Sequence, residues 1–137
     1  MQYNANYHDL LLTELLTTAF GVLDANSLAL LREHLRWVEV AGGQSLIEQG
    51  EPGDSMYLSV SGRLRAYVQQ DDGSQKMVRE MGRGQVIGEM SLFTNEPRSA
   101  TVVAIRDSVL VRLDKPQFDA LVASNPQVSM ALTRQII

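Results

Sequence analysis

The sequence contains no cysteine in its 137 residues, which excludes a disulfide framework, a thiolate metal site and a cysteine nucleophile. It has no apolar run close to the roughly 18 residues that a membrane span requires. The first ten residues, MQYNANYHDL, lack the basic region and the long apolar stretch of a secretory signal. A net charge of −4 is unfavourable for non-specific nucleic-acid binding. Together these absences predict a cytoplasmic chain with no membrane span and no nucleic-acid partner.

Catalytic and metal-binding patterns are absent as well. His8 and His34 are far apart and have no neighbouring ligand types, so we predict surface or interface positions for them and no metal site. The Asp71-Asp72 pair lies in a turn rather than in a converging pair of carboxylates, which leaves general acid–base chemistry without an apparatus. No serine stands in a G-x-S-x-G setting. The sequence therefore does not predict an enzyme.

The residues that are present suit one domain with one substantial core, because hydrophobic types make up 45% of the chain. Residues 1–36 read as N-terminal helices, with Gly21 as a break and Asp24 or Asn26 as a cap. Residues 115–137 read as C-terminal helices, with Pro116 and Pro126 in first turns.

Residues 37–114 read as short β-strands. Nine of the ten glycines lie between positions 42 and 88, which indicates many turns. Met56, Leu58 and Val60 alternate with their neighbours, Asp71 to Ser74 forms a hairpin turn, and 102–105 and 109–113 read as two strands. This spacing favours a sandwich or jelly roll over a parallel sheet.

One carboxylate and one guanidinium stand out in this region. Glu89 follows Gly88, and Arg98 follows Pro97 just before a β-branched stretch, in a segment that looks buried. Buried charges are costly unless a partner or ligand compensates them. Arginine can grip one phosphate with a bidentate fork, and glutamate can accept from a hydroxyl. A ribose that carries a phosphate offers both groups at short range.

The segment GEMSLFTNEPRSATV resembles the phosphate-binding cassette of the cyclic nucleotide-binding domain family, as in catabolite activator-type regulators. Upstream, QGEPGDSMYL and SGRL match the glycine-punctuated strands of that family in the right order. The run from Arg98 to Val128 is similar, more weakly, to the cyclic nucleotide domains of bacterial patatin-like esterases.

The resemblance implies an eight-stranded β-roll with a cassette over residues 84–104 and with helices before and after it. It implies that Arg98 binds the cyclic phosphate and Glu89 the ribose 2′-hydroxyl. The implied ligand-binding set is Gly88, Glu89, Met90, Ser91, Arg98, Ser99 and Ala100. Candidates for the base pocket are Ala66, Val78, Arg79 and Ile87, for each of which an ordinary structural role is the alternative. Leu92 and Phe93 are the candidates for coupling the cassette to the C-terminal helices.

The expected ligand is a 3′,5′-cyclic mononucleotide, with cyclic AMP favoured. Cyclic GMP is the second candidate, because Arg79 suits the O6/N7 edge of guanine. The alternative for Arg79 is pairing with Glu80 or another surface carboxylate.

Two effectors are open under this reading: an enzyme or channel, or a helix-turn-helix module absent from this chain. A degenerate domain that binds nothing is disfavoured, because both charged residues are present. A homodimer through the terminal helices is a further candidate. The last helix stops at Ile136-Ile137 without a capping signal, which predicts truncation. The residue that covers the base is expected past Ile137, with Met130, Leu132 and Ile136 either near the pocket or packed on the roll.

Overall fold

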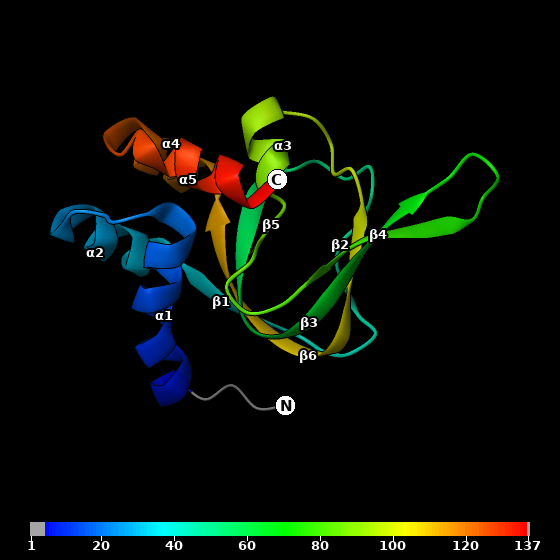
Figure 1. Ribbon diagram of the computed structural model, residues 1–137, viewed down its shortest axis with the longest axis horizontal. Helices are drawn as coiled ribbons and strands as arrows, with labels where there is room; N and C mark the ends of the chain where they lie inside the picture. The colour runs from blue at the N-terminus through cyan, green and yellow to red at the C-terminus, as the bar shows by residue number, and fades with distance from the viewer. Residues whose placement is uncertain (1–4, 137) are drawn as a thin grey trace.

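The computed structural model describes residues 5–136 and shows a β-roll with helices gathered at one end (Figure 1). In chain order the elements are α1 (Ala5–Phe20), α2 (Ala25–His34), β1 (Arg36–Val40), β2 (Ser45–Ile47), β3 (Ser55–Gln69), β4 (Gln75–Met81), β5 (Val86–Ile87), α3 (Glu89–Thr94), β6 (Thr101–Asp114), α4 (Lys115–Ser124) and α5 (Gln127–Ile136).

The expected mainly β fold with flanking helices is confirmed. All strand pairs are antiparallel, in the order β1-β6-β3-β4, with β2 paired to β6 and β5 paired to β3. β3 and β6 are long, with 15 and 14 residues, and their pairing shifts register near Ser61 and Arg63 of β3. If each of these two strands is counted as two segments, one on either side of the shifts, the six strands correspond to an eight-stranded roll. The two strands expected at 102–105 and 109–113 are therefore one bent strand, β6.

Local sequence signals account for the helix ends. Gly21 ends α1 with a φ of +83°, a conformation that favours glycine, and its N–H donates to the Thr17 carbonyl. Asp24 rather than Asn26 caps α2, because its carboxylate accepts from the Ser27 N–H at 2.8 Å. Pro116 lies in the first turn of α4, as expected.

Alternation along β3 divides the core into two clusters. Met56, Leu58 and Val60 face the helices, where they join leucines of α1 and Phe118 of α4. Tyr57 faces the other way, into the interior of the roll. Leu64 and Ala66 join Tyr57 there because the register shifts between Ser59 and Leu64 invert the alternation.

For the helical segments, the expectation for His8 is wrong, and an alternative left open for the last helix is decided. His8 is 4% exposed, not a surface residue, because its ring lies 6.1 Å from the Trp37 ring. For the last helix, packing rather than a place near the pocket holds for Leu132, which is fully buried in the helix-side cluster. Met130 is 63% exposed, and the side chain of Ile136 falls outside the described residues.

Within residues 5–136, none of the helices taken singly has the length and apolarity to cross a membrane. The segments Tyr7–Phe20 and Ala25–His34 meet both criteria only when joined, across a bend of 114°.

Candidate functional site

A cavity of about 170 Å³ opens between the interior of the roll and the short helix α3. All eleven residues that the sequence singled out for the ligand and base pockets line it: Ala66, Val78, Arg79, Ile87, Gly88, Glu89, Met90, Ser91, Arg98, Ser99 and Ala100. They come from β3, β4, β5, α3 and the segment before β6. The fold therefore brings together positions that are more than thirty residues apart in the chain.

Arg98 is held in place by neutral groups. Its side chain is 3% exposed, and its guanidinium donates from Nη1 to the Gly88 carbonyl at 2.9 Å and from Nη2 to Ser55 Oγ at 3.1 Å. The nearest carboxylate oxygen, Oδ1 of the exposed Asp54, lies 4.0 Å away. Burial lowers the pKa of Arg98, while Tyr57 and Asp54 act in the opposite direction. This guanidinium stays charged, and among residues 5–136 the exposed Asp54 is its one carboxylate neighbour within 4.0 Å.

Glu89 is the second buried charge of the cavity. It is 4% exposed and begins α3. Its carboxylate has no hydrogen bond or ion pair to another residue in the part of the chain that the structure describes. Burial raises the pKa of Glu89, and the positive charges of Arg79 and Arg98 partly oppose this effect. A group that donates a hydrogen bond to this carboxylate would favour its ionised form.

Gly88 fits between these two residues for a steric reason. Its φ is +82°, and a Cβ at this position would collide with Nη1 of Arg98. The absence of a side chain thus lets the Arg98 fork reach the Gly88 carbonyl. Gly88 thus determines both the turn that precedes Glu89 and the position of the Arg98 guanidinium.

The two sequence blocks that carried the resemblance lie against each other. The Arg98 N–H donates to the Glu51 carbonyl at 2.8 Å, and the Gly50 N–H donates to the Arg98 carbonyl at 2.9 Å. A Cβ on Gly53 would overlap the side chain of Ser91. The upstream block therefore forms the support on which the cassette segment rests.

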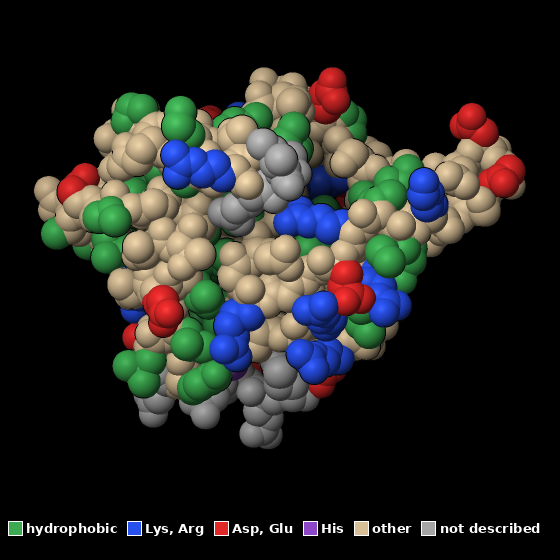
Figure 2. Space-filling view, in the orientation of Figure 1, with side chains coloured by type: hydrophobic (Ala, Val, Ile, Leu, Met, Phe, Trp, Pro, Cys, Tyr) green, Lys and Arg blue, Asp and Glu red, His purple; other side chains and the backbone are tan. Residues whose placement is uncertain are grey.

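Arg79 faces the cavity from β4, opposite Ala66 of β3. It does not pair with Glu80, because the Glu80 carboxylate binds Arg63 and Arg65 on the other face of the strand, each at 2.7 Å. On the face shown in Figure 2, basic side chains outnumber acidic ones over the roll. This distribution favours an anionic ligand at the roll even though the chain as a whole is negative.

Sequence reasoning missed several residues of the site. Ile47, Met81 and Val102 also line the cavity. Met81 follows Arg79 by two positions, so the alternation of β4 could have identified it. Ser55 and Asp54 stand inside the upstream block QGEPGDSMYL and could have been found there, whereas nothing around Ile47 points to the cavity.

The remaining predicted side chains differ in exposure. Ser91, Ala66 and Ile87 are buried, whereas Val78 and Met90 are about half exposed, at 50% and 45%. Leu92 is buried in the helix-side cluster. Phe93 meets Phe118 of α4 edge to face, with ring centroids 5.3 Å apart. The short helix α3 thus touches both the cavity and the C-terminal helices.

Comparison with known proteins gives one family and several similar structures. A family model described as a cyclic nucleotide-binding domain matches residues 37–125. The patatin-like phospholipase domain-containing protein 7 of Rattus norvegicus is 37% identical over 94 residues, which cover 69% of this chain and 7% of that protein.

Two solved structures extend the comparison to the fold. The catabolite activator protein of Thermus thermophilus has a TM-score of 0.77 at 28% identity, over 87% of this chain and 56% of that one. The regulatory domain of Toxoplasma gondii PKA, crystallised with cAMP, has a TM-score of 0.80 at 26% identity, over 97% and 49%. The chain spans about 7% of the length of the curated relatives it matches.

Proposed function

Because the chain belongs to the cyclic nucleotide-binding domain family, which matches it over residues 37–125, we propose that it binds cyclic AMP reversibly and transmits this event to an effector. It is a cyclic nucleotide-binding regulatory domain. The identity of the nucleotide, the contacts of each residue and the transmission step are the proposal.

The observation that carries the proposal is a pair of buried, opposite charges that line one cavity without an ion pair between them. In the proposed complex, Arg98 binds the equatorial oxygens of the cyclic phosphate, and Glu89 accepts from the ribose 2′-hydroxyl. Each contact gives a buried charge a hydrogen-bonding partner in place of the water that burial removes. Ser91, Ser99 and Ala100 are small, which suits a close approach of the phosphate to the backbone.

The base is proposed to lie against Ala66, Val78 and Ile87. Arg79 supports a second ligand, cyclic GMP, because it lines the cavity and its sequence neighbour Glu80 is occupied by Arg63 and Arg65. Arginine can donate twice to the O6/N7 edge of guanine, whereas adenine offers no such pair of acceptors. We propose that the Ser99 hydroxyl assists if the base is syn.

Transmission is proposed to run through α3. Movement of Glu89 toward the ribose would shift Leu92 and Phe93, and Phe93 contacts Phe118 of α4. A shift of this kind carries a signal only if the nucleotide has different affinities for two arrangements of the helices. A phospholipase-type effector is supported by the rat relative, and a DNA-binding effector by the catabolite activator neighbour. A homodimer through the terminal helices stays a prediction.

Calorimetric titration with cyclic AMP and with cyclic GMP tests the binding proposal. We expect saturable one-to-one binding, tighter for cyclic AMP. Absence of heat and of any thermal stabilisation with both nucleotides at millimolar concentration would favour the degenerate, non-binding alternative.

A further inference from the structure

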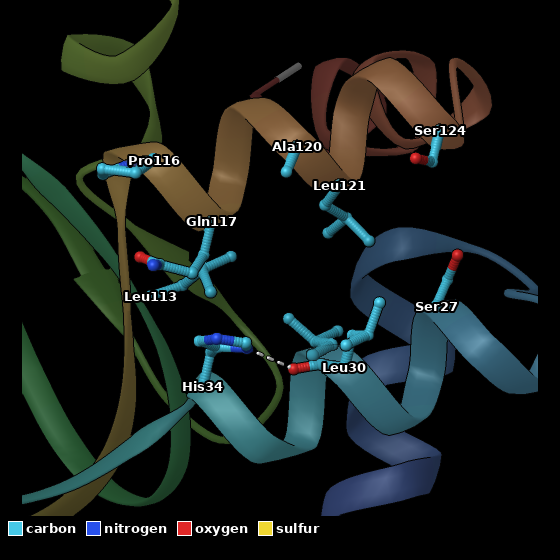
Figure 3. A pocket seen from close by; sticks show the side chains of 10 residues that line it. Ser27, Leu30, His34, Leu113, Pro116, Gln117, Ala120, Leu121 and Ser124 are labelled. Carbon is cyan, nitrogen blue, oxygen red and sulfur yellow. Dashed lines mark hydrogen bonds between the residues drawn. The ribbon is translucent and has the colours of Figure 1, made fainter.

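A second cavity lies between the two helical segments, apart from the cassette (Figure 3). Its volume is about 240 Å³, against about 170 Å³ for the cavity that holds Glu89 and Arg98. Its walls come from α2 and α4, with Leu113 at the end of β6. It shares no lining residue with the cassette cavity.

The middle of this cavity is apolar. Leu30 of α2 lies across it from Ala120 and Leu121 of α4 (Figure 3), and Leu31 also lines it. Leu30 is 57% exposed, so its side chain leaves apolar surface in contact with water. A ligand body that covers this surface would gain the hydrophobic contribution of removing it from water.

One end of the cavity carries polar groups with free hydrogen-bonding capacity. His34 and Gln117 lie together at this end (Figure 3). Nδ1 of His34 is 2.8 Å from the Leu30 carbonyl oxygen, which can only accept, so Nδ1 carries the hydrogen. In the neutral ring Nε2 is then an acceptor. The Gln117 amide has no hydrogen bond to any residue in the range 5–136 and offers both donors and an acceptor.

At the opposite end, Ser27 and Ser124 supply hydroxyl groups, and the Ser27 hydroxyl already has partners. Ser27 Oγ already donates to Asp24 and accepts from Asn125 Nδ2. No lysine or arginine lines the cavity, and the net charge of the chain is −4. A carboxylate or phosphate head group would therefore find no cation at either end other than a protonated His34.

We propose that this cavity binds a small uncharged amphiphile, with an aliphatic or aromatic body and one hydroxyl group. The hydroxyl donates to Nε2 of His34 and accepts from the Gln117 amide, and the body lies between Leu30, Leu31 and Leu121. An apolar cavity of about 150 Å³ in another protein holds benzene. A ligand of about ten non-hydrogen atoms is a reasonable match for this larger cavity.

The test is a titration of the nucleotide-free, ¹⁵N-labelled domain with 4-propylphenol at pH 8, followed by amide chemical shifts. We expect saturable shifts confined to α2 and α4. The methyl ether 4-propylanisole has the same body but cannot donate, and it should bind roughly tenfold more weakly, which is the scale of one hydrogen bond. Equal affinities would overturn the assignment of the hydroxyl, and shifts that do not saturate would overturn the site.

Matched variants locate the binding. Ala120→Phe places a ring in the cavity and should abolish the saturable shifts. Ala123→Phe adds the same ring to the same helix at an exposed position that does not line the cavity, and should leave binding unchanged. Equal loss in both variants would contradict the proposal. His34→Phe keeps a ring but removes the Nε2 acceptor, and should bring the affinities of the phenol and the anisole together. Gln117→Leu should weaken both ligands and keep the ratio of their affinities. Because no nucleotide is present, failure of this site and failure of cyclic nucleotide binding are independent results.

Discussion

Glu89 and Arg98 lie in the wall of one cavity as residues that are 4% and 5% exposed, and no ion pair joins their side chains. Arg98 instead donates to the Gly88 carbonyl and to Ser55 Oγ. Two buried charges that do not neutralise each other raise the free energy of the empty domain. A ligand that supplies an anion to one and a donor to the other recovers part of this free energy on binding, and the predictions below follow from that relationship.

Replacing Arg98 with alanine should abolish detectable nucleotide binding and leave the fold intact. Loss of a buried cation that binds the phosphate costs roughly 3–5 kcal/mol, a factor of hundreds or more in affinity. Calorimetry measures the affinity, and circular dichroism checks the fold. Arg106→Ala is the control, because Arg106 is exposed and lies away from this cavity. An Arg98→Ala variant that titrates like the wild type would place the site elsewhere.

Glu89→Gln should weaken the binding of cyclic AMP more than that of its 2′-deoxy analogue. A hydrogen bond to a charged acceptor contributes about 1.5–3 kcal/mol, and the analogue cannot form it. The two ligands should therefore converge in affinity in the variant. If the wild-type preference for the ribonucleotide persists at full size, Glu89 does not bind the ribose.

The same residue predicts a pH dependence of stability. Burial raises the pKa of Glu89 above the ordinary value of 4.5, so the folded domain binds its proton more tightly than the unfolded chain does. Its contribution to the free energy of unfolding then falls as pH rises from about 4.5 through the raised pKa. Glu89→Gln should thus melt higher than the wild type at pH 7, and the difference should shrink toward pH 4. A constant difference across this range would contradict the shift.

Alanine substitutions at two glycines separate the effect of backbone strain on stability from the effect of displacing Arg98 on nucleotide binding. Gly21 and Gly88 have φ angles of +83° and +82°, but a Cβ on Gly21 meets nothing within 4 Å, whereas one on Gly88 collides with Arg98. Both alanine variants should lose stability, by about 1–2 kcal/mol for the left-handed conformation. Only Gly88→Ala should also lose nucleotide affinity, because it displaces the guanidinium. Comparable affinities for the two variants would show that Arg98 can move without consequence.

Arg79→Ala tests the choice of base. If Arg79 binds the O6/N7 edge of guanine, the variant should lose affinity for cyclic GMP by about 1–3 kcal/mol and keep most of its affinity for cyclic AMP. Competition of both nucleotides against one fluorescent analogue gives the ratio directly. An unchanged ratio would remove Arg79 from base recognition.

Through the resemblance to the family's motifs, the sequence identified eleven of the fourteen residues that line the cavity. By itself it determined the order of helices and strands and the breaks at Gly21 and at Asp71 to Ser74. These follow from local rules, since caps, turns and alternation depend on neighbours in the chain. The spacing of Gly88, Glu89 and Arg98 within one short segment identified the phosphate-binding cassette by its resemblance to the family motif.

Only the tertiary structure decided which groups those residues meet. Ser55 lies 43 positions before Arg98 and Asp54 lies 44 before it, and no local pattern links them to the guanidinium. Burial of His8 against Trp37, the continuity of β6 through its bend, and the pairing of Glu80 with Arg63 and Arg65 rather than with Arg79 are also non-local outcomes. They depend on strand register and helix packing, which arise from the competition of all side chains for one interior and cannot be resolved from any window of the sequence.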